Sequence, residues 1–236
     1  MQLFFHPAIS EDVKEVIFDK EESRHITKVL RKSEGDILDL TNGKGYLFKV
    51  KILQANPKQC LGKILTAEIQ QPLPYYLHIA VAPTKLNDRY EWFLEKATEI
   101  GVSEITPIIC HHSERSVVKL ERMNKKIQSA MKQSLKAYLP KLNSPISFKD
   151  FVGSEENKIS KKLIAHCENS SKDSLKSVLV KNESTTILIG PEGDFSSQEI
   201  ELAKNTSFIP VSLGKSRLRT ETAAIVACHS VAFINE

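Results

Sequence analysis

The sequence contains few of the residues that build covalent or metal cross-links. Its 236 residues include four cysteines, Cys60, Cys110, Cys167 and Cys228, and no two of them form a C-x-x-C pair. Zinc sites and disulfide frameworks are recognised by short cysteine spacings of that kind. Neither is therefore encoded locally, and we expect four reduced, buried thiols.

Long apolar runs are also missing. A membrane-spanning helix needs about 18 or more apolar residues in succession, and no segment of the chain reaches that length. Residues 1–7 lack the basic-then-apolar order of a signal peptide. The composition, 41% hydrophobic and 26% charged, is that of an ordinary globular protein. We therefore expect a cytoplasmic protein without a membrane partner.

The nine glycines do not form the common nucleotide-binding loops. No G-x-G-x-x-G is present, which leaves a dinucleotide site unsupported. Gly214-Lys215-Ser216 suggests a phosphate-binding loop, but that motif requires a glycine at position 209, where the chain has isoleucine. A metal site is not expected either, because Cys110, His111 and His112 are adjacent on a strand and point to alternate faces.

Positive charge is concentrated in one segment. The chain has a formal charge of +4 and a pI near 8.7, and residues 119–141 carry seven cations against the single Glu121. Such a segment would attract phosphate by releasing counterions. A solvated helix face is the equally good alternative.

Two regions with different patterns follow one another. Residues 1–71 contain short strand-like runs at 15–18, 36–40, 46–52 and 61–65, one short helix at 23–30, and a glycine-rich hairpin turn at 42–45. These features predict a small β-barrel. The prolines at 72 and 74 then interrupt regular structure, so we place a domain boundary there.

Beyond the boundary, residues 73–236 alternate between strands and helices. The expected elements are strand 77–82, helix 89–100, strand 104–110, helix 119–135 and strand 162–167, followed by helix, strand and helix. This alternation predicts an α/β domain with a mostly parallel sheet and helices on both faces. The last helix, Thr222 to Ile234, is apolar nearly all the way round, so it must be buried within the fold or between subunits.

Two glycine turns carry the clearest functional signal. Residues 185–196 form a β-branched strand, a Gly-Pro-Glu-Gly turn and a helix start at Ser196 with Glu199 as a capping box. Residues 209–223 form a strand, a turn at Gly214 with two arginines, and the apolar helix. Turns at the carboxyl ends of parallel strands are where open α/β sheets bind ligands. For the first turn alone, an ordinary strand-to-helix connection is the alternative.

Together with residues 96–102, these two segments resemble the RsmE family of SPOUT methyltransferases over essentially the whole chain. The resemblance implies a PUA-like RNA-binding β-barrel at 1–71 and a trefoil-knotted SPOUT methyltransferase domain at 73–236. It implies a homodimer that uses S-adenosylmethionine to methylate N3 of a uridine in 16S ribosomal RNA, within the small ribosomal subunit. A ribose 2′-hydroxyl or a transfer RNA base as target, and a non-catalytic RNA-binding protein of ribosome assembly, remain alternatives.

The resemblance also implies a cofactor site built from three neighbouring loops. Its expected residues are His166, Leu188, Ile189, Gly190, Pro191, Glu192, Gly193, Leu213, Gly214 and Leu218. The sequence departs from the family pattern at Asp194, which replaces the second glycine of a pair, at Lys136, which replaces an arginine, and in the spacing of Arg217 and Arg219.

Methyl transfer from a sulfonium requires alignment more than covalent catalysis, and removal of the uridine N3 proton is helped by a base or by nearby cations. We therefore assign Arg219, with Arg217, to the developing anion or a neighbouring phosphate. Glu192 or Glu221 would accept the proton or orient an arginine, although Glu221 equally suits a helix N-terminus.

Contacts to RNA are expected from cations outside these turns. The candidates are Arg24, His25, Lys28, Arg31, Arg115 and Lys136. Phosphate contacts of this kind position a protein on RNA. Solvated surface charge is the alternative interpretation for each of them.

Overall fold

The computed structural model describes residues 2–154 and 160–236. The chain forms two compact units, one made of Met1–Pro72 with Met131–Leu139 and the other of Leu73–Ala130 with Pro140–Glu236. In the described part of the chain, no helix combines the length and the apolar character needed to cross a membrane.

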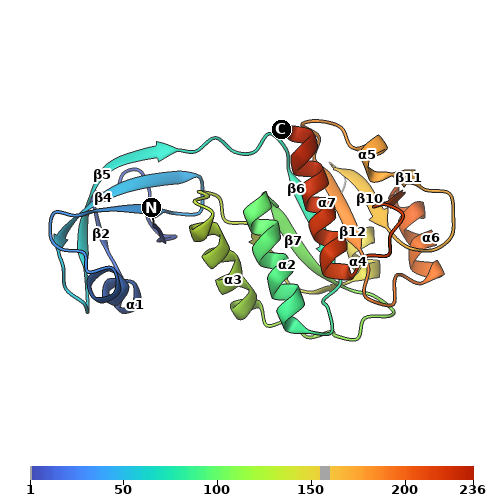
Figure 1. Ribbon diagram of the computed structural model, residues 1–236, viewed down its shortest axis with the longest axis horizontal. Coiled ribbons are helices and arrows are strands. Elements are labelled where there is room, and N and C mark those ends of the chain that lie inside the picture. The colour runs from blue at the N-terminus through green and yellow to red at the C-terminus, as the bar shows by residue number, and fades with distance from the viewer. Residues whose placement is uncertain (1, 155–159) are drawn as a thin grey trace. The chain divides into compact units, whose positions relative to one another are not determined.

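The first unit is a curled sheet of five strands (Figure 1). The strands are β1 (Leu3–Phe5), β2 (Glu15–Ile17), β3 (Ile37–Thr41), β4 (Tyr46–Gln54) and β5 (Leu61–Ile69), in the order β1-β3-β4-β5-β2. Only β1 pairs in parallel, with β3. Alternate residues of β4, Phe48, Val50 and Ile52, are buried in its core. The barrel expected from the sequence is thus a curled sheet whose edges are β1 and β2.

The short helix expected at residues 23–30 is two pieces. α1 (Lys20–Arg24) is capped by Asp19, whose side chain accepts the backbone N–H of Glu22, and a π-helical turn, His25–Val29, continues it. The start was missed by three residues because an aspartate N-cap directly before a charged first turn was not recognised.

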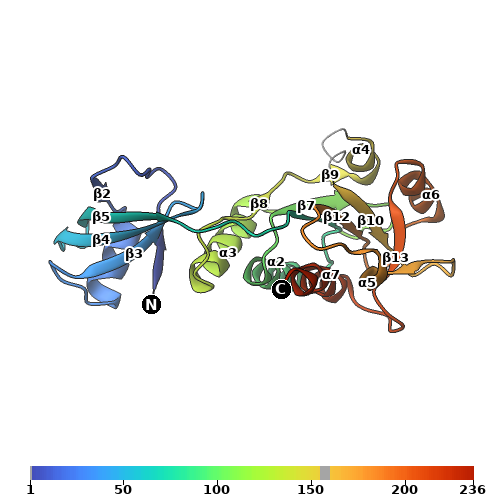
Figure 2. The same cartoon turned by 90° about the horizontal axis from the view of Figure 1, so that it is seen from above.

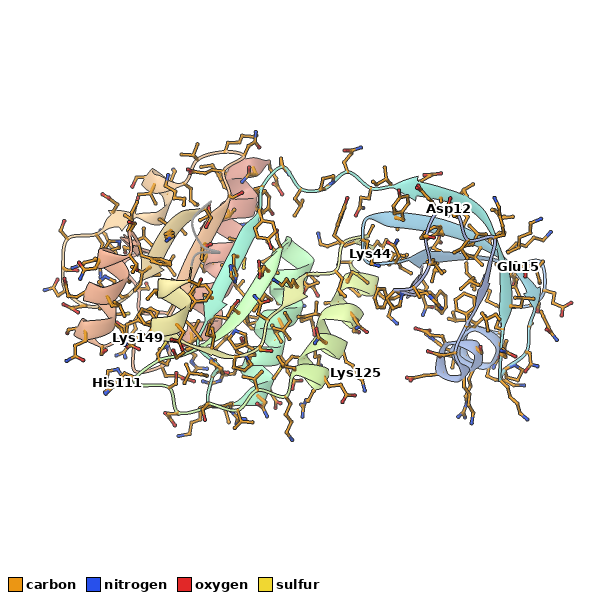
Figure 3. The ribbon with its side chains drawn as sticks, turned by 180° about the vertical axis from the view of Figure 1, so that it is seen from behind. Asp12, Glu15, Lys44, His111, Lys125 and Lys149 are labelled. Carbon is orange, nitrogen blue, oxygen red and sulfur yellow. The ribbon has the colours of Figure 1, made fainter. Side chains whose placement is uncertain are left out.

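The hairpin between β3 and β4 explains why residues 131–139 belong to this unit. Gly43 and Gly45 have φ values of +72° and +101°, and a side chain at Gly45 would collide with the ring of Tyr138. Across the same contact, Gly45 N–H donates to the carbonyl of Ala137 and Leu139 N–H donates to that of Gly43. Figure 3 labels Lys44 at the tip of this hairpin. The unit is therefore discontinuous in sequence, which the residue pattern did not indicate.

The second unit is built on a sheet of parallel strands. Its strands are β6 (Leu77–Val81), β7 (Glu104–Ile109), β8 (Lys141–Leu142), β10 (Lys161–Ala165), β11 (Asp173–Ser174), β12 (Thr185–Ile189) and β13 (Ile209–Ser212), in the order β11-β13-β10-β12-β6-β7-β8, and β9 (Ile146–Ser147) pairs with β7. The strands β12 and β13 flank β10 on opposite sides, although β12 and β13 follow each other in sequence. The chain therefore crosses β10 between them.

Helices cover both faces of this sheet, as Figure 2 shows. The helices after residue 73 are α2 (Asn87–Ile100), α3 (Leu120–Gln133), α4 (Phe148–Gly153), α5 (Leu175–Val178), α6 (Ser197–Asn205) and α7 (Thr220–Asn235), and the last residues of α3 belong to the first unit. α4 and α6 pack on one face over Ala80, Ile164 and Leu188. α2 and α7 lie together on the other face. The predicted α/β architecture is confirmed, and the short elements β1 and α4 were missed because three to six residues give little periodicity.

Candidate functional site: a cradle of three loops

Three loops meet where β10, β12 and β13 end. Since these strands are parallel neighbours, their carboxyl ends lie at one edge of the sheet. Two adjoining cavities of about 600 and 280 Å³ open between the loops. Both cavities are lined by Ala165, Cys167, Asp194, Arg217, Leu218 and Ala223. Their volumes lie in or near the range of small-molecule sites, about 300–1,000 Å³.

Most of the residues expected at a cofactor site line these cavities. His166, Leu213 and Gly214 line the larger, Ile189, Gly190, Pro191 and Glu192 line the smaller, and Leu218 lines both. The two glycine turns, about 24 positions apart in the sequence, are thus brought together.

Two of the expected residues lie elsewhere. The side chain of Leu188 packs in the core beneath α6, because alternate residues of a strand face opposite sides of the sheet. Gly193 lies against His112, where an added Cβ would come within 2.9 Å of the Cβ of His112. Its lack of a side chain allows the loops after β7 and β12 to approach each other.

His166 is a buried histidine without a protein partner. Its side chain is 7% exposed, and neither ring nitrogen forms a hydrogen bond within the described residues. Burial, assisted by the nearby charge of Lys172, lowers the pKa of His166 below its ordinary value. The imidazole is therefore neutral at pH 7 and presents one donor and one acceptor at the larger cavity.

The two glutamates have different surroundings. Glu192 lines the smaller cavity, and its Oε1 accepts the backbone N–H of Lys85 at 3.0 Å. Its Oε2 is covered and has no hydrogen-bond partner in the part of the chain that the structure describes. Glu221 is buried in the first turn of α7, with Oε1 3.8 Å from Nε of Arg89. It does not line either cavity. The geometry therefore places Glu192, and not Glu221, where a substrate proton could be accepted.

Arg217 and Arg219 are exposed side chains at the mouth of the cavities. Arg217 lines both, and Arg219, the N-cap residue of α7, lines the smaller one. Neither forms an ion pair within residues 2–154 and 160–236. Both guanidinium groups are thus available to an anion.

The loop after β7 supports this edge of the sheet. Arg115 donates from Nε and Nη2 to the carbonyl of Lys85, at 3.2 and 2.8 Å, so it braces the loop after β6. His111 donates its backbone N–H to Glu199 and lies beside Lys149 at a shallow hollow (Figure 3). The guanidinium of Arg115, proposed for RNA, already has a structural partner here.

The remaining RNA candidates lie in the first unit. Arg24, Lys28 and Arg31 are exposed, with Arg24 and Lys28 one helical turn apart. His25 differs, because its ring packs against Phe4 and its Nε2 lies 3.2 Å from the amide of Gln2. Lys136 is half-buried, and burial lowers its pKa.

Sequence reasoning missed several contributors to the cavities. The side chains of Ala165 and Ala223 carry no polar group, so only their positions, at the end of β10 and in α7, could have suggested them. Cys167 was expected to be buried, but it is exposed at the cavities while the other three cysteines are buried. It follows the last residue of β10 by two positions, in the loop, and this placement overturns the expectation.

Comparison with known proteins agrees with this geometry. Residues 71–232 match the model of an RNA methyltransferase domain, and residues 18–65 match an RNA methyltransferase PUA domain. The Ribosomal RNA small subunit methyltransferase E of Buchnera aphidicola is 31% identical over 227 residues, covering 92% of this chain and 87% of that protein.

Two solved structures have nearly the same fold. One, described as a probable rRNA-methyltransferase from Porphyromonas gingivalis, has a TM-score of 0.92 at 40% identity and covers 100% of this chain and 98% of its own. The other, a Ribosomal RNA small subunit methyltransferase E from Neisseria gonorrhoeae bound to S-adenosyl methionine, has a TM-score of 0.87 at 26% identity, with coverage of 100% and 98%. The predicted SPOUT-type fold with a PUA-like N-terminal domain is confirmed. The chain belongs to the RsmE family of RNA methyltransferases.

Proposed function

We propose that the protein transfers the methyl group of S-adenosylmethionine to N3 of a uridine in 16S ribosomal RNA of the small subunit. The observation that carries the proposal is the pair of joined cavities framed by the two glycine turns. The Buchnera and Neisseria relatives are named as ribosomal RNA small subunit methyltransferases, which supports ribosomal RNA as the substrate. The Neisseria structure is bound to S-adenosyl methionine, which supports this compound as the cofactor.

The residues present fit such a cofactor. The larger cavity, about 600 Å³, is lined by backbone at Gly214 and by the neutral imidazole of His166. Leaving a buried polar group unpaired costs about 1–3 kcal/mol, so a ligand with hydrogen-bonding groups would compensate the two orphaned nitrogens of His166. Leu213, Leu218 and Ala223 add apolar surface for a flat ring.

In this proposal, S-adenosylmethionine supplies an activated methyl group, and the chain aligns the acceptor and manages its charge. Glu192, which lines the smaller cavity, accepts the N3 proton. Arg219 and Arg217 stabilise the negative charge that develops on the uracil oxygens. Glu221 orients Arg89 across α2 and α7.

RNA binding and methyl transfer are assigned to the two different regions of the sequence. We propose that residues 1–71 bind RNA through Arg24, Lys28 and Arg31, assisted by His25, and that residues 73–236 carry out methyl transfer. Lys136, and Arg115 by shaping its loop, would extend the RNA contact. Ribosomal RNA as substrate places the protein in the cytoplasm.

Mass spectrometry of ribosomal nucleosides tests the reaction. Deletion of the gene is expected to remove one 3-methyluridine from 16S RNA and to leave other methylated nucleosides unchanged. Re-expression of the intact chain should restore it. If the deletion removed a 2′-O-methyl nucleoside or a transfer RNA modification instead, that target would replace N3 of uridine. If no nucleoside changed and calorimetry showed no cofactor binding, a non-catalytic assembly protein would be favoured.

We further propose that the protein is a homodimer that uses α7. This helix buries Ala224, Ala227 and Cys228 in its own fold, yet its opposite side exposes Phe233 by 69%. The ring of Phe233 lies one turn from His229, at 5.9 Å. Aromatic residues are enriched in subunit interfaces relative to the rest of a protein surface, which favours this side of α7 as the contact.

A charge at this position should separate the subunits. We expect F233E to raise the dimer dissociation constant at least about 30-fold, which corresponds to an interface hot spot of about 2 kcal/mol. Light scattering coupled to size exclusion measures this. V29E, at a residue 67% exposed in the first unit, is the matched control and should leave the mass unchanged. Equal masses for wild type and F233E would contradict the use of this face.

A further inference from the structure

Asp194 occupies an unusual place in the turn after β12. Its φ is +63°, in the left-handed region that residues other than glycine seldom adopt, although Asp and Asn tolerate it better than most. Its backbone N–H donates to the carbonyl of Pro191, which closes the turn around Glu192 and Gly193. Glycine would adopt this conformation without strain, so the aspartate side chain needs another explanation.

The carboxylate of Asp194 connects this turn to the loop after β10. Its Oδ2 accepts the backbone N–H of Cys167 at 2.7 Å, and its Oδ1 accepts that of Phe195 at 2.9 Å. The Asp194 carbonyl lies 3.0 Å from Nδ1 of His112, in the loop after β7. Because a carbonyl can only accept, Nδ1 of His112 carries the proton. One residue thus joins three loops.

A lysine also holds the loop after β10. The ammonium group of Lys172 donates to the carbonyls of His166 and Glu168, at 2.8 and 2.6 Å. The peptide N–H between these two carbonyls, that of Cys167, is the one bound by Asp194. Both of these interactions are charge-assisted hydrogen bonds, which are about twice as strong as neutral ones.

We propose that Asp194 is a positioning residue for the methyl donor, because its carboxylate fixes the backbone of residues 165–168 against the turn at 190–194. This inference rests on the proposed function. Ala165 and Cys167 form part of the wall shared by the two cavities, and His166 lines the larger one. The methyl donor and the acceptor would meet along that wall, and a small displacement of either one would lower the rate of methyl transfer.

Two substitutions separate this role from local turn geometry. D194G removes the carboxylate and relieves the positive φ, so it should fold as well as wild type, with a melting temperature within a few degrees. We expect its Kd and KM for S-adenosylmethionine to rise about tenfold, with the KM for RNA unchanged. D194N keeps an oxygen that can accept the Cys167 N–H and tolerates positive φ, and it should stay within about threefold of wild type. D36G is the matched control, since the carboxylate of Asp36 accepts the backbone N–H of Ser33 in a turn of the first unit, and Asp36 lines neither cavity.

Alkylation of Cys167 gives a readout that does not depend on activity. Cys167 is the exposed cysteine of the four, so iodoacetamide reports the mobility of its loop in protein without cofactor. We expect several-fold faster modification of Cys167 in D194G than in wild type, D194N or D36G.

The outcomes are distinct. If D194G had the cofactor affinity and the alkylation rate of wild type, the inference would be overturned. Equal weakening of cofactor binding in D194G and D194N would also overturn it, because the charge of Asp194, and not its hydrogen bond to Cys167, would then be responsible for the effect. Failure of wild type to bind S-adenosylmethionine in calorimetry would overturn the proposed function, and the alkylation comparison would still decide whether Asp194 fixes the loop.

Discussion

Replacement of Arg219 by alanine is expected to lower the turnover number about 100- to 1,000-fold while leaving the affinity for S-adenosylmethionine within about twofold of wild type. Arg219 lines the smaller cavity with an exposed guanidinium. A positioned group that stabilises charge only in the transition state contributes about this much to the rate. Single-turnover kinetics on small-subunit RNA, with calorimetry of the cofactor, measure the two quantities.

Two companion variants sharpen this expectation. R219K retains the charge but loses the planar, bidentate geometry of the guanidinium, and it should recover part of the lost rate. R24A removes an exposed arginine of the first unit, and it should raise the KM for RNA with little effect on turnover. If R219A turned over at the wild-type rate, Arg219 would not take part in the reaction.

Replacement of Ala223 by phenylalanine is expected to weaken binding of S-adenosylmethionine more than about 100-fold. Ala223 lies in the first turn of α7 and lines both cavities. A phenyl ring there occupies space that a ligand would need, and such pockets bury most of a ligand's surface. The helix itself is little affected, because alanine and phenylalanine differ by about 0.5 kcal/mol in helix propensity. Calorimetry and thermal unfolding measure the two effects.

Two control variants separate the effect of side-chain size from the effect of its position in the chain. A223S changes the same position by one atom and should bind the cofactor nearly as wild type does. S129F places the same ring on the exposed face of α3 and should leave affinity unchanged. Wild-type affinity in a folded A223F protein would show that the joined cavities do not hold the cofactor.

The local elements of this protein could be predicted because each is encoded by neighbouring residues. The strand Thr185–Ile189 is a run of β-branched and aliphatic residues, and Ser196 with Glu199 forms the predicted capping box at the start of α6. Elements of two or three residues, such as β8, β9 and β11, were missed because their pairing partners lie far away in the sequence. The same reason hides the attachment of residues 131–139 to the hairpin at 42–45.

The candidate site, like the fold, could be predicted from the sequence only in part. Glycines 190 and 214 could be found from the sequence because turns leave a local signature. The contact between Asp194 and Cys167 could not, since a carboxylate 27 positions away from a backbone N–H leaves no pattern. The side chain of Leu188 points into the core and that of Ile189 toward the cavity, and the sequence of a wholly buried strand does not distinguish its two faces.

The sequence alone thus determined most of the longer strands and helices, the two glycine turns and the family resemblance, since propensity, capping and turn chemistry act over a few residues. The tertiary structure decided which loops share a cavity, that Glu192 and not Glu221 reaches it, and that Arg115 already has a partner. These outcomes depend on strand order across the sheet. Neighbouring strands bring together residues from positions 165, 190 and 217, and only packing fixes which side chains face one another.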